Sequence, residues 1–252
     1  MPGSLVTLTV DESPMQTYMA VPEGNGPFPG VAVAQHRLGI DVFMRNICDR
    51  LAEAGYVAAA PDIYHRGWSL EQFAEITAMP RGDERAEAVL PSLSAALTEP
   101  EVVRDMNATF THLKEHPDVD RARLGVLGFC MGGRISYLMA TRNASLKATA
   151  CFYPGGIFSS RGGGPSAFAA SDRIESPIIA FTGADDENPS PADMERVDKE
   201  LTRLKVEHEF HLYDGMAHAF MDPTNPRAYS DDVVNDAWSM LVAFYDTKLK
   251  GN

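Results

Sequence analysis

Three residues that lie far apart in the chain have the side chains needed to cleave an ester: Cys130, one aspartate of the pair Asp185–Asp186, and His218. Cys130 lies in the sequence GFCMG, between an apolar run and a segment with helical spacing. This G-x-C-x-G pattern is a nucleophile elbow with sulfur in place of the usual serine oxygen. The start of the following helix favours a thiolate, because the helix dipole and the first main-chain N–H groups stabilise negative charge. Cys130 is therefore the candidate nucleophile.

An acid and a histidine follow this cysteine in the chain order that such a nucleophile requires. The acidic loop 184–187 follows the apolar run PIIAFTG, and His218 follows the run EHEFHLYD. Both positions fall at the carboxyl ends of predicted strands, where sheets of this kind place their sites. His218 would accept the thiol proton or hold the thiolate as an ion pair, and the aspartate would fix the imidazole tautomer. Of the seven histidines, only His218 lies between the last predicted strand and the last predicted helix.

The elements that must position these residues alternate along the chain. Two β-rich runs, 5–10 and 15–21, predict an antiparallel hairpin. The later strands are predicted at 30–35, 56–60, 123–129, 148–153, 177–182 and 207–213, and the helices at 42–54, 101–115, 131–141, 192–204 and 231–248. We expect irregular and helical cover over residues 62–100. This order predicts an α/β fold, with a doubly wound, mostly parallel sheet and an N-terminal β-hairpin, in a single domain over residues 1–252.

Composition excludes several classes of function. The 35 acidic and 22 basic residues give a net charge of −13, which argues against nucleic acid or an anionic membrane as partner. Three cysteines, Cys48, Cys130 and Cys151, do not form a disulfide framework. Without a signal-peptide pattern or an apolar run of about 18 residues, a cytoplasmic protein is expected.

No cofactor is expected. The segment HLKEH at 112–116 matches a short zinc motif but has no third ligand nearby, so we interpret it as a solvated helix end and predict no metal. The expected partner is a small molecule, bound by a monomer or a small homo-oligomer.

The sequence resembles the dienelactone hydrolase family over nearly its whole length. The resemblance is carried by GVAVAQ followed by Gly39 and FMR, then by AGYVAAAPDIYHR, GFCMGGR, TGADDENPSP and GMAHAF. It implies an α/β-hydrolase fold with a Cys–Asp–His triad that hydrolyses enol lactones and other small esters. The family pattern G-x-x-D, counted from Gly183, selects Asp186 rather than Asp185. The resemblance also implies an oxyanion hole made by the main-chain N–H groups of Met131 and Arg37.

Two positions depart from the family pattern. His36 stands where family members have a glutamate near the thiol, and it would either help to ionise the sulfur or lie on the polar rim of the pocket. Asp222 stands where family members bind the substrate carboxylate with an arginine. That charge would have to come from one of four other arginines, namely Arg37, Arg81, Arg134 and Arg227.

The Gly/Ser-rich loop after the predicted strand at 148–153 should line the pocket. Phe158 and Phe168 would give this loop an apolar wall, unless they belong to the core.

These observations predict a cysteine-dependent hydrolase of small activated esters or lactones. The tetrahedral intermediate expels the better of its two leaving groups, and the enzyme's thiolate leaves more easily than an alkoxide or an amine, since the pKa of a thiol is only about 8.5. Cleavage therefore requires a substrate whose own leaving group is good. Enol lactones, phenyl esters and thioesters should therefore be cleaved, and peptides should not. Two alternatives stay open: a non-catalytic protein of this fold that binds a small ligand, and a thiol-dependent acyl transferase.

Overall fold

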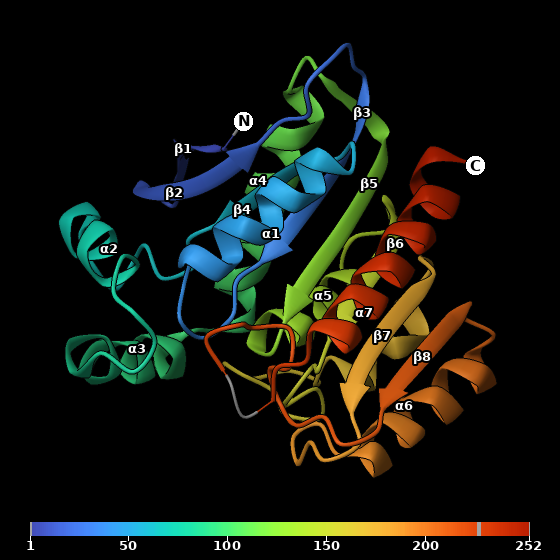
Figure 1. Cartoon of the computed structure of the whole chain (residues 1–252). Helices are drawn as coiled ribbons and strands as arrows, with labels where there is room; N and C mark the ends of the chain where they lie inside the picture. Colours follow the sequence, from blue (N-terminus) through green and yellow to red (C-terminus); the bar gives the residue numbers. More distant parts are fainter. Residues whose placement is uncertain (1, 226–227, 252) are drawn as a thin grey trace. The chain divides into compact units, whose positions relative to one another are not determined.

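The computed structural model describes residues 2–225 and 228–251 and divides the chain into two compact units, residues 1–122 and 123–252 (Figure 1). Each unit is an α/β structure. Among the described residues, no helix has the length and apolar character that crossing a membrane would require.

The first unit contains four neighbouring strands in the order β1-β2-β4-β3. Strands β1 (Ser4–Val10) and β2 (Ser13–Ala20) form an antiparallel hairpin. Its two-residue turn, Asp11-Glu12, has φ values of 51° and 62°. Positive φ angles at both turn residues give the turn a twist that matches the right-handed twist of the two strands. Strand β4 (Val57–Pro61) runs antiparallel to β2 and parallel to β3 (Phe28–Ala34). The hairpin predicted from the two β-rich runs is confirmed.

Four helices complete the first unit. Helix α1 (Val42–Glu53) begins where the Asp41 carboxylate accepts a hydrogen bond from the Met44 N–H at 3.1 Å. The region 62–100 contains helices α2 (Leu70–Ile76) and α3 (Glu84–Ala96), which begin at the side-chain caps Ser69 and Asp83. Helix α4 (Glu99–Glu115) starts two residues earlier than predicted and includes Pro100. The prediction began the helix after this proline, but proline is well tolerated in the first turn of a helix.

The second unit contains four parallel strands in the order β5-β6-β7-β8. Strand β5 (Val119–Phe129) enters this unit at Arg123 and is followed by β6 (Leu146–Phe152), β7 (Ile178–Gly183) and β8 (His208–Tyr213). The helices are α5 (Met131–Ala140), α6 (Pro191–Leu204) and α7 (Asp231–Tyr245), with a short 3₁₀ helix at Phe168–Arg173 and a π turn at Asp246–Lys250. Figure 1 shows the strands of this unit pointing the same way, so their carboxyl ends lie together.

A row of rings crosses the second unit where the strands end. Phe129, Phe152, Phe181 and His211 are paired in register across β5 to β8. Their ring centroids are 4.7, 4.4 and 5.1 Å apart in that order. This stack, buried at the three phenylalanines and half-buried at His211, gives the loops at the carboxyl ends a rigid base. The predicted α/β class, with an N-terminal hairpin and mostly parallel strands, is confirmed, while the single-domain organisation stays a prediction.

Candidate active site

Cys130 lies at a sharp bend between β5 and α5, with φ 55° and ψ −118°. A positive φ is strained for a residue with a side chain. Main-chain hydrogen bonds hold the bend: the Cys130 N–H donates to Phe152 O at 3.0 Å, and the Arg134 N–H donates to Cys130 O at 3.2 Å. A Cβ atom on Gly128 would lie 2.0 Å from Gly132 O. The glycine there is therefore required by close backbone packing, as the elbow pattern predicts.

The acidic loop presents two neighbouring aspartates in different environments. Asp186 is 4 % exposed, and its Oδ2 accepts a hydrogen bond from His218 Nδ1 at 2.8 Å. Its Oδ1 accepts a second bond from the Asn188 N–H at 2.8 Å. Asp185 is exposed to solvent. The geometry thus pairs Asp186, not its neighbour, with the histidine.

The acid loop and the histidine loop are joined through their main chains. The Asp185 N–H donates to Met216 O at 3.0 Å. A Cβ atom on Gly183 would lie 1.9 Å from the same oxygen. Only glycine lets β7 end so close to the segment before His218, and this close approach fixes the distance between acid and base.

The surroundings of His218 favour its protonated form. Burial of the ring opposes protonation, but hydrogen bonds to Asp186 and to Cys130, together with their negative charges, outweigh it and raise the pKa of His218 to about 10. The Asn225 side chain also donates to His218 O at 3.1 Å. Cys130, His218 and Asp186 are therefore connected in series within the second unit. This connection can support an imidazolium–thiolate pair.

Tyr153 is a neighbour of the histidine that the sequence did not single out. It is 1 % exposed, has φ 36°, and its N–H donates to Phe181 O at 2.7 Å. Its ring contacts the His218 ring edge-on, with centroids 5.0 Å apart. A tyrosine that ends a buried strand is an ordinary core residue in a sequence, so no local signal distinguishes this position.

Three of the predicted substrate-binding side chains make local contacts in the same unit. The Arg134 guanidinium donates to Gly156 O at 3.1 Å and to Ser159 O at 3.0 Å, and so fixes the Gly/Ser-rich loop. The rings of Phe158 and Phe168 lie 4.6 Å apart. Arg196 of α6 lies over both rings, at 4.4 and 4.9 Å. The two rings are thus half-buried packing partners of each other and of a cation.

Asp222, the fourth such residue, is 2 % exposed. Its Oδ1 accepts hydrogen bonds from the Thr224 N–H at 2.9 Å and the Thr224 hydroxyl at 2.7 Å. Its main chain takes part in the same tight turn, which follows His218. Asp222 therefore stabilises the loop that carries the histidine.

Two further predicted residues, His36 and Arg37, belong to the first unit. His36 Nε2 lies 3.0 Å from Asp41 Oδ1. The Arg37 side chain lies 3.4 Å from Glu87, and Arg37 O accepts a hydrogen bond from the Tyr64 hydroxyl at 3.0 Å. The role of His36 near the sulfur stays a prediction, as do the oxyanion-hole roles of Arg37 and of Met131, the first residue of α5.

Arg227 lies outside the described residues. Within the described residues, no three side chains of the types that bind metals gather in one place.

Comparisons of the sequence and of the structure with known proteins agree with one another. The model of the dienelactone hydrolase family matches residues 15–249. A provisionally named carboxymethylenebutenolidase from Synechocystis is 33% identical over 249 residues, which cover 98% of this chain and 97% of the relative. A protein of the same provisional name from Methylorubrum extorquens is 27% identical, over 94% of this chain and 78% of the relative. The crystal structure of a provisionally named dienelactone hydrolase from Klebsiella pneumoniae is also similar, with a TM-score of 0.82 and 25% identity over 96% of this chain and 97% of that one.

Proposed function

The chain belongs to the dienelactone hydrolase family and has its α/β-hydrolase fold, and on that premise we propose that it hydrolyses small activated esters or lactones with Cys130 as the nucleophile. The observation that carries the proposal is the series of hydrogen bonds from Cys130 to His218 and from His218 to Asp186, the last at 2.8 Å. A strained cysteine at the start of a helix, beside a protonated imidazole, has the environment that activates a thiolate.

The first half of the reaction forms a thioester on the enzyme. The Cys130 thiolate attacks the ester carbonyl, and the carbonyl oxygen becomes an oxyanion. The family resemblance assigns the Met131 N–H, in the first turn of α5, as a donor to this oxyanion, and the helix dipole at this end favours the negative charge. When the intermediate collapses, the C–O bond breaks and His218 donates its proton to the departing oxygen.

The second half restores the thiolate. His218, now neutral, takes a proton from water, and the hydroxide attacks the thioester carbon. The C–S bond breaks, the acid product leaves, and the sulfur departs as a thiolate beside the imidazolium. Asp186 keeps Nδ1 as a donor throughout, so Nε2 faces the reacting atoms in both steps.

The expected substrates have good leaving groups. The Cys130 thiolate competes with the substrate's leaving group for departure from the tetrahedral intermediate. A thiol of ordinary pKa, about 8.5, leaves more easily than an alkoxide does, so a substrate with a poor leaving group is released uncleaved. Enol lactones, phenyl esters and thioesters therefore react, and amides return to starting material.

Arg134 and Asp222, two charged residues of the second unit, do not provide a site for a substrate carboxylate. Arg134 is already bound to two loop carbonyls, and Asp222 is bound to Thr224. The Arg134 guanidinium is thus occupied by these carbonyls, and the Asp222 carboxylate would repel a second carboxylate.

Hydrolysis of p-nitrophenyl acetate and of a dienelactone, with and without iodoacetamide, tests the proposal. We expect p-nitrophenyl acetate, which has no carboxylate, to be hydrolysed faster than the dienelactone, and we expect iodoacetamide to abolish this turnover and Cys130→Ala to lack it. Cys151→Ala is the matched control, because burial raises the pKa of the Cys151 thiol well above its usual range and the thiol makes no proposed contribution. Ester turnover that survives in Cys130→Ala would exclude the cysteine mechanism.

A further inference from the structure

Strand β8 is the last strand in the order β5-β6-β7-β8, and its residues are only partly buried. Leu212 is 53 % exposed, and Met240 of the adjacent helix α7 is 36 % exposed. Among the described residues of the second unit, these two are the exposed large hydrophobic side chains. Such an edge strand carries outward main-chain groups that can pair with another strand.

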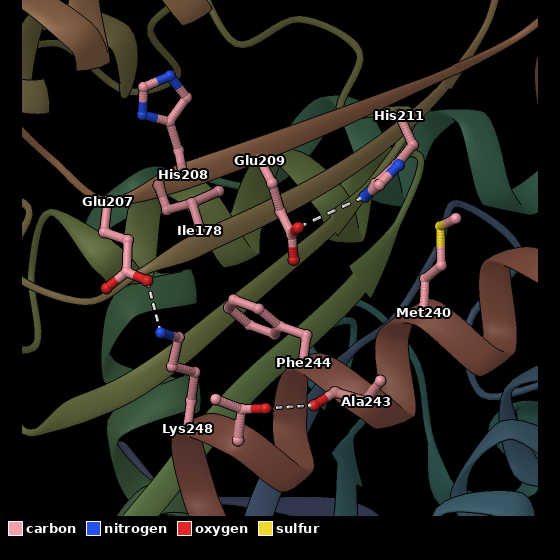
Figure 2. A pocket seen from close by; sticks show the side chains of 10 residues that line it. Ile178, Glu207, His208, Glu209, His211, Met240, Ala243, Phe244 and Lys248 are labelled. Carbon is pink, nitrogen blue, oxygen red and sulfur yellow. Dashed lines mark hydrogen bonds and ion pairs between the residues drawn. The ribbon is translucent and has the colours of Figure 1, made fainter.

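A groove of about 450 Å³ runs between β8 and α7 (Figure 2). Figure 2 shows Glu207, Glu209 and His211 pointing from the strand into this groove, whose other wall includes Met240 and Phe244 of α7. Lys248 pairs with Glu207, so the charge of that carboxylate is balanced within the chain.

The printed hydrogen bonds to β7 show which main-chain groups of β8 face outward. The Ile178 N–H donates to Glu207 O at 3.0 Å, and the Ala184 N–H donates to Tyr213 O at 2.9 Å. Because the direction of main-chain groups alternates along a strand, residues 207, 209, 211 and 213 direct theirs toward β7. His208, Phe210 and Leu212 therefore direct their N–H and C=O groups away from the sheet.

We propose that β8 pairs antiparallel with β8 of a second copy of this chain, around a twofold axis at Phe210. In this register Phe210 faces Phe210 of the second copy, and His208 faces Leu212 of the second copy. Each of these positions has its main-chain groups directed outward, so all form hydrogen-bonded pairs. The strands β5 to β8 of the two copies then make one continuous sheet.

The side chains are complementary in this register. Glu209 faces His211 of the second copy, and the twofold axis repeats the contact. These are non-hydrogen-bonded positions, where side chains approach each other closely. Within one chain, His211 is half-buried and its Nε2 lies 3.8 Å from the Glu209 carboxylate, so each strand presents an acidic and a basic group two positions apart on the same face. An in-register parallel pairing would instead place Glu209 beside Glu209, which is unfavourable.

The oligomeric state tests the proposal. Sedimentation velocity over a range of concentrations should show a monomer–dimer equilibrium. Leu212→Pro removes an outward N–H without touching the bonds to β7, and should weaken dimerisation by about thirtyfold, the equivalent of one main-chain hydrogen bond from each strand. Leu212→Ala keeps the N–H and is the matched control, in which most of the dimer should remain. Unchanged circular dichroism and ester hydrolysis would show that both variants are folded. A chain that is monomeric at every concentration, or a dimer that Leu212→Pro does not weaken, would overturn the proposal.

A cross-linking experiment tests the register itself. In a Cys130→Ala background, Phe210→Cys should form an intermolecular disulfide on mild oxidation, because hydrogen-bonded partners have Cα atoms about 5.5 Å apart, which a disulfide can span. His208→Cys is the control on the same strand edge, since in this register it faces Leu212 rather than itself. Equal cross-linking at both positions, or none at Phe210→Cys, would exclude a twofold axis at Phe210. A disulfide that is specific to Phe210→Cys supports it.

Discussion

Replacing Asp186 by asparagine should impair turnover through the tautomer and the charge of His218. The Asp186 carboxylate accepts the hydrogen bond from His218 Nδ1 at 2.8 Å and is 4 % exposed. In Asp186→Asn the amide can donate to Nδ1, and this would direct the remaining N–H of the ring toward the sulfur. The ring would then be unable to accept the thiol proton.

The size of the effect follows from this bond. A hydrogen bond to a charged group contributes about 1.5–3 kcal/mol, and its loss in the transition state lowers kcat/KM about 10- to 150-fold. Trapping the wrong tautomer increases the loss toward about 10⁴-fold. The pKa of His218, which Asp186 and Cys130 together raise to about 10 against the effect of burial, should also fall. Because the active form is the imidazolium–thiolate pair, the alkaline limb of the kcat/KM profile should move to lower pH.

The assay is the pH dependence of p-nitrophenyl acetate hydrolysis, with Asp185→Asn as matched control. Asp185 is the exposed neighbour of Asp186 and makes a main-chain contact to Met216, so its variant should retain kcat/KM within about twofold, as surface substitutions usually do. If Asp185→Asn loses as much activity as Asp186→Asn, or if neither loses any, the assignment of the acid is wrong.

Three further predictions concern Gly128 at the elbow, the buried carboxyl group of Asp62, and the predicted role of His36. Gly128→Ala should lower the thermal midpoint, measured by calorimetry, more than Gly163→Ala. The new Cβ at Gly128 would lie 2.0 Å from Gly132 O, whereas at Gly163 it meets nothing within 4 Å and only the positive φ of 85° opposes alanine. Burial raises the pKa of Asp62 from 3.8 to about 6, although hydrogen bonds to the carboxyl group act in the opposite direction. The folded state therefore holds this proton more tightly than the unfolded state does. The resulting contribution to stability is fully present below the unfolded pKa and is lost as the pH rises through about 6. Urea titrations of the wild type should show this fall, up to about 3 kcal/mol at 1.36 kcal/mol for each pH unit, and Asp62→Asn should not. If His36 helps to form the thiolate, His36→Ala should raise the pH at which iodoacetamide alkylates Cys130, whereas an unchanged profile would leave His36 its contacts with Asp41 and Phe43 within the first unit.

Local patterns in the sequence were enough to predict most of the strands and helices and to identify Cys130 as the candidate nucleophile. Buried parallel strands have short apolar runs, amphipathic helices have apolar residues at helical spacing, and a G-x-C-x-G turn between them has a steric cause that is itself local. For this reason the hairpin, the strands β5 to β8 and the helix after Cys130 could be predicted. Residues 62–100 were harder, because α2 has only 7 residues and α3 continues through Pro91, which a sequence pattern would treat as a helix break.

Contacts between distant segments could be decided only by the tertiary structure. Asp185 and Asp186 are neighbours of the same type, and what separates them is burial and a 2.8 Å bond to a histidine 32 positions further along the chain. Arg134 has the helical spacing of a residue near the nucleophile, yet its guanidinium binds loop carbonyls at Gly156 and Ser159. Tyr153 meets His218 because the segments that follow β6 and β8 come together beyond the carboxyl ends of the strands. The sequence determined which residues are chemically capable, since that depends on residue type and local backbone; the tertiary structure decided their partners, since hydrogen bonds and burial depend on which distant segments the fold brings together.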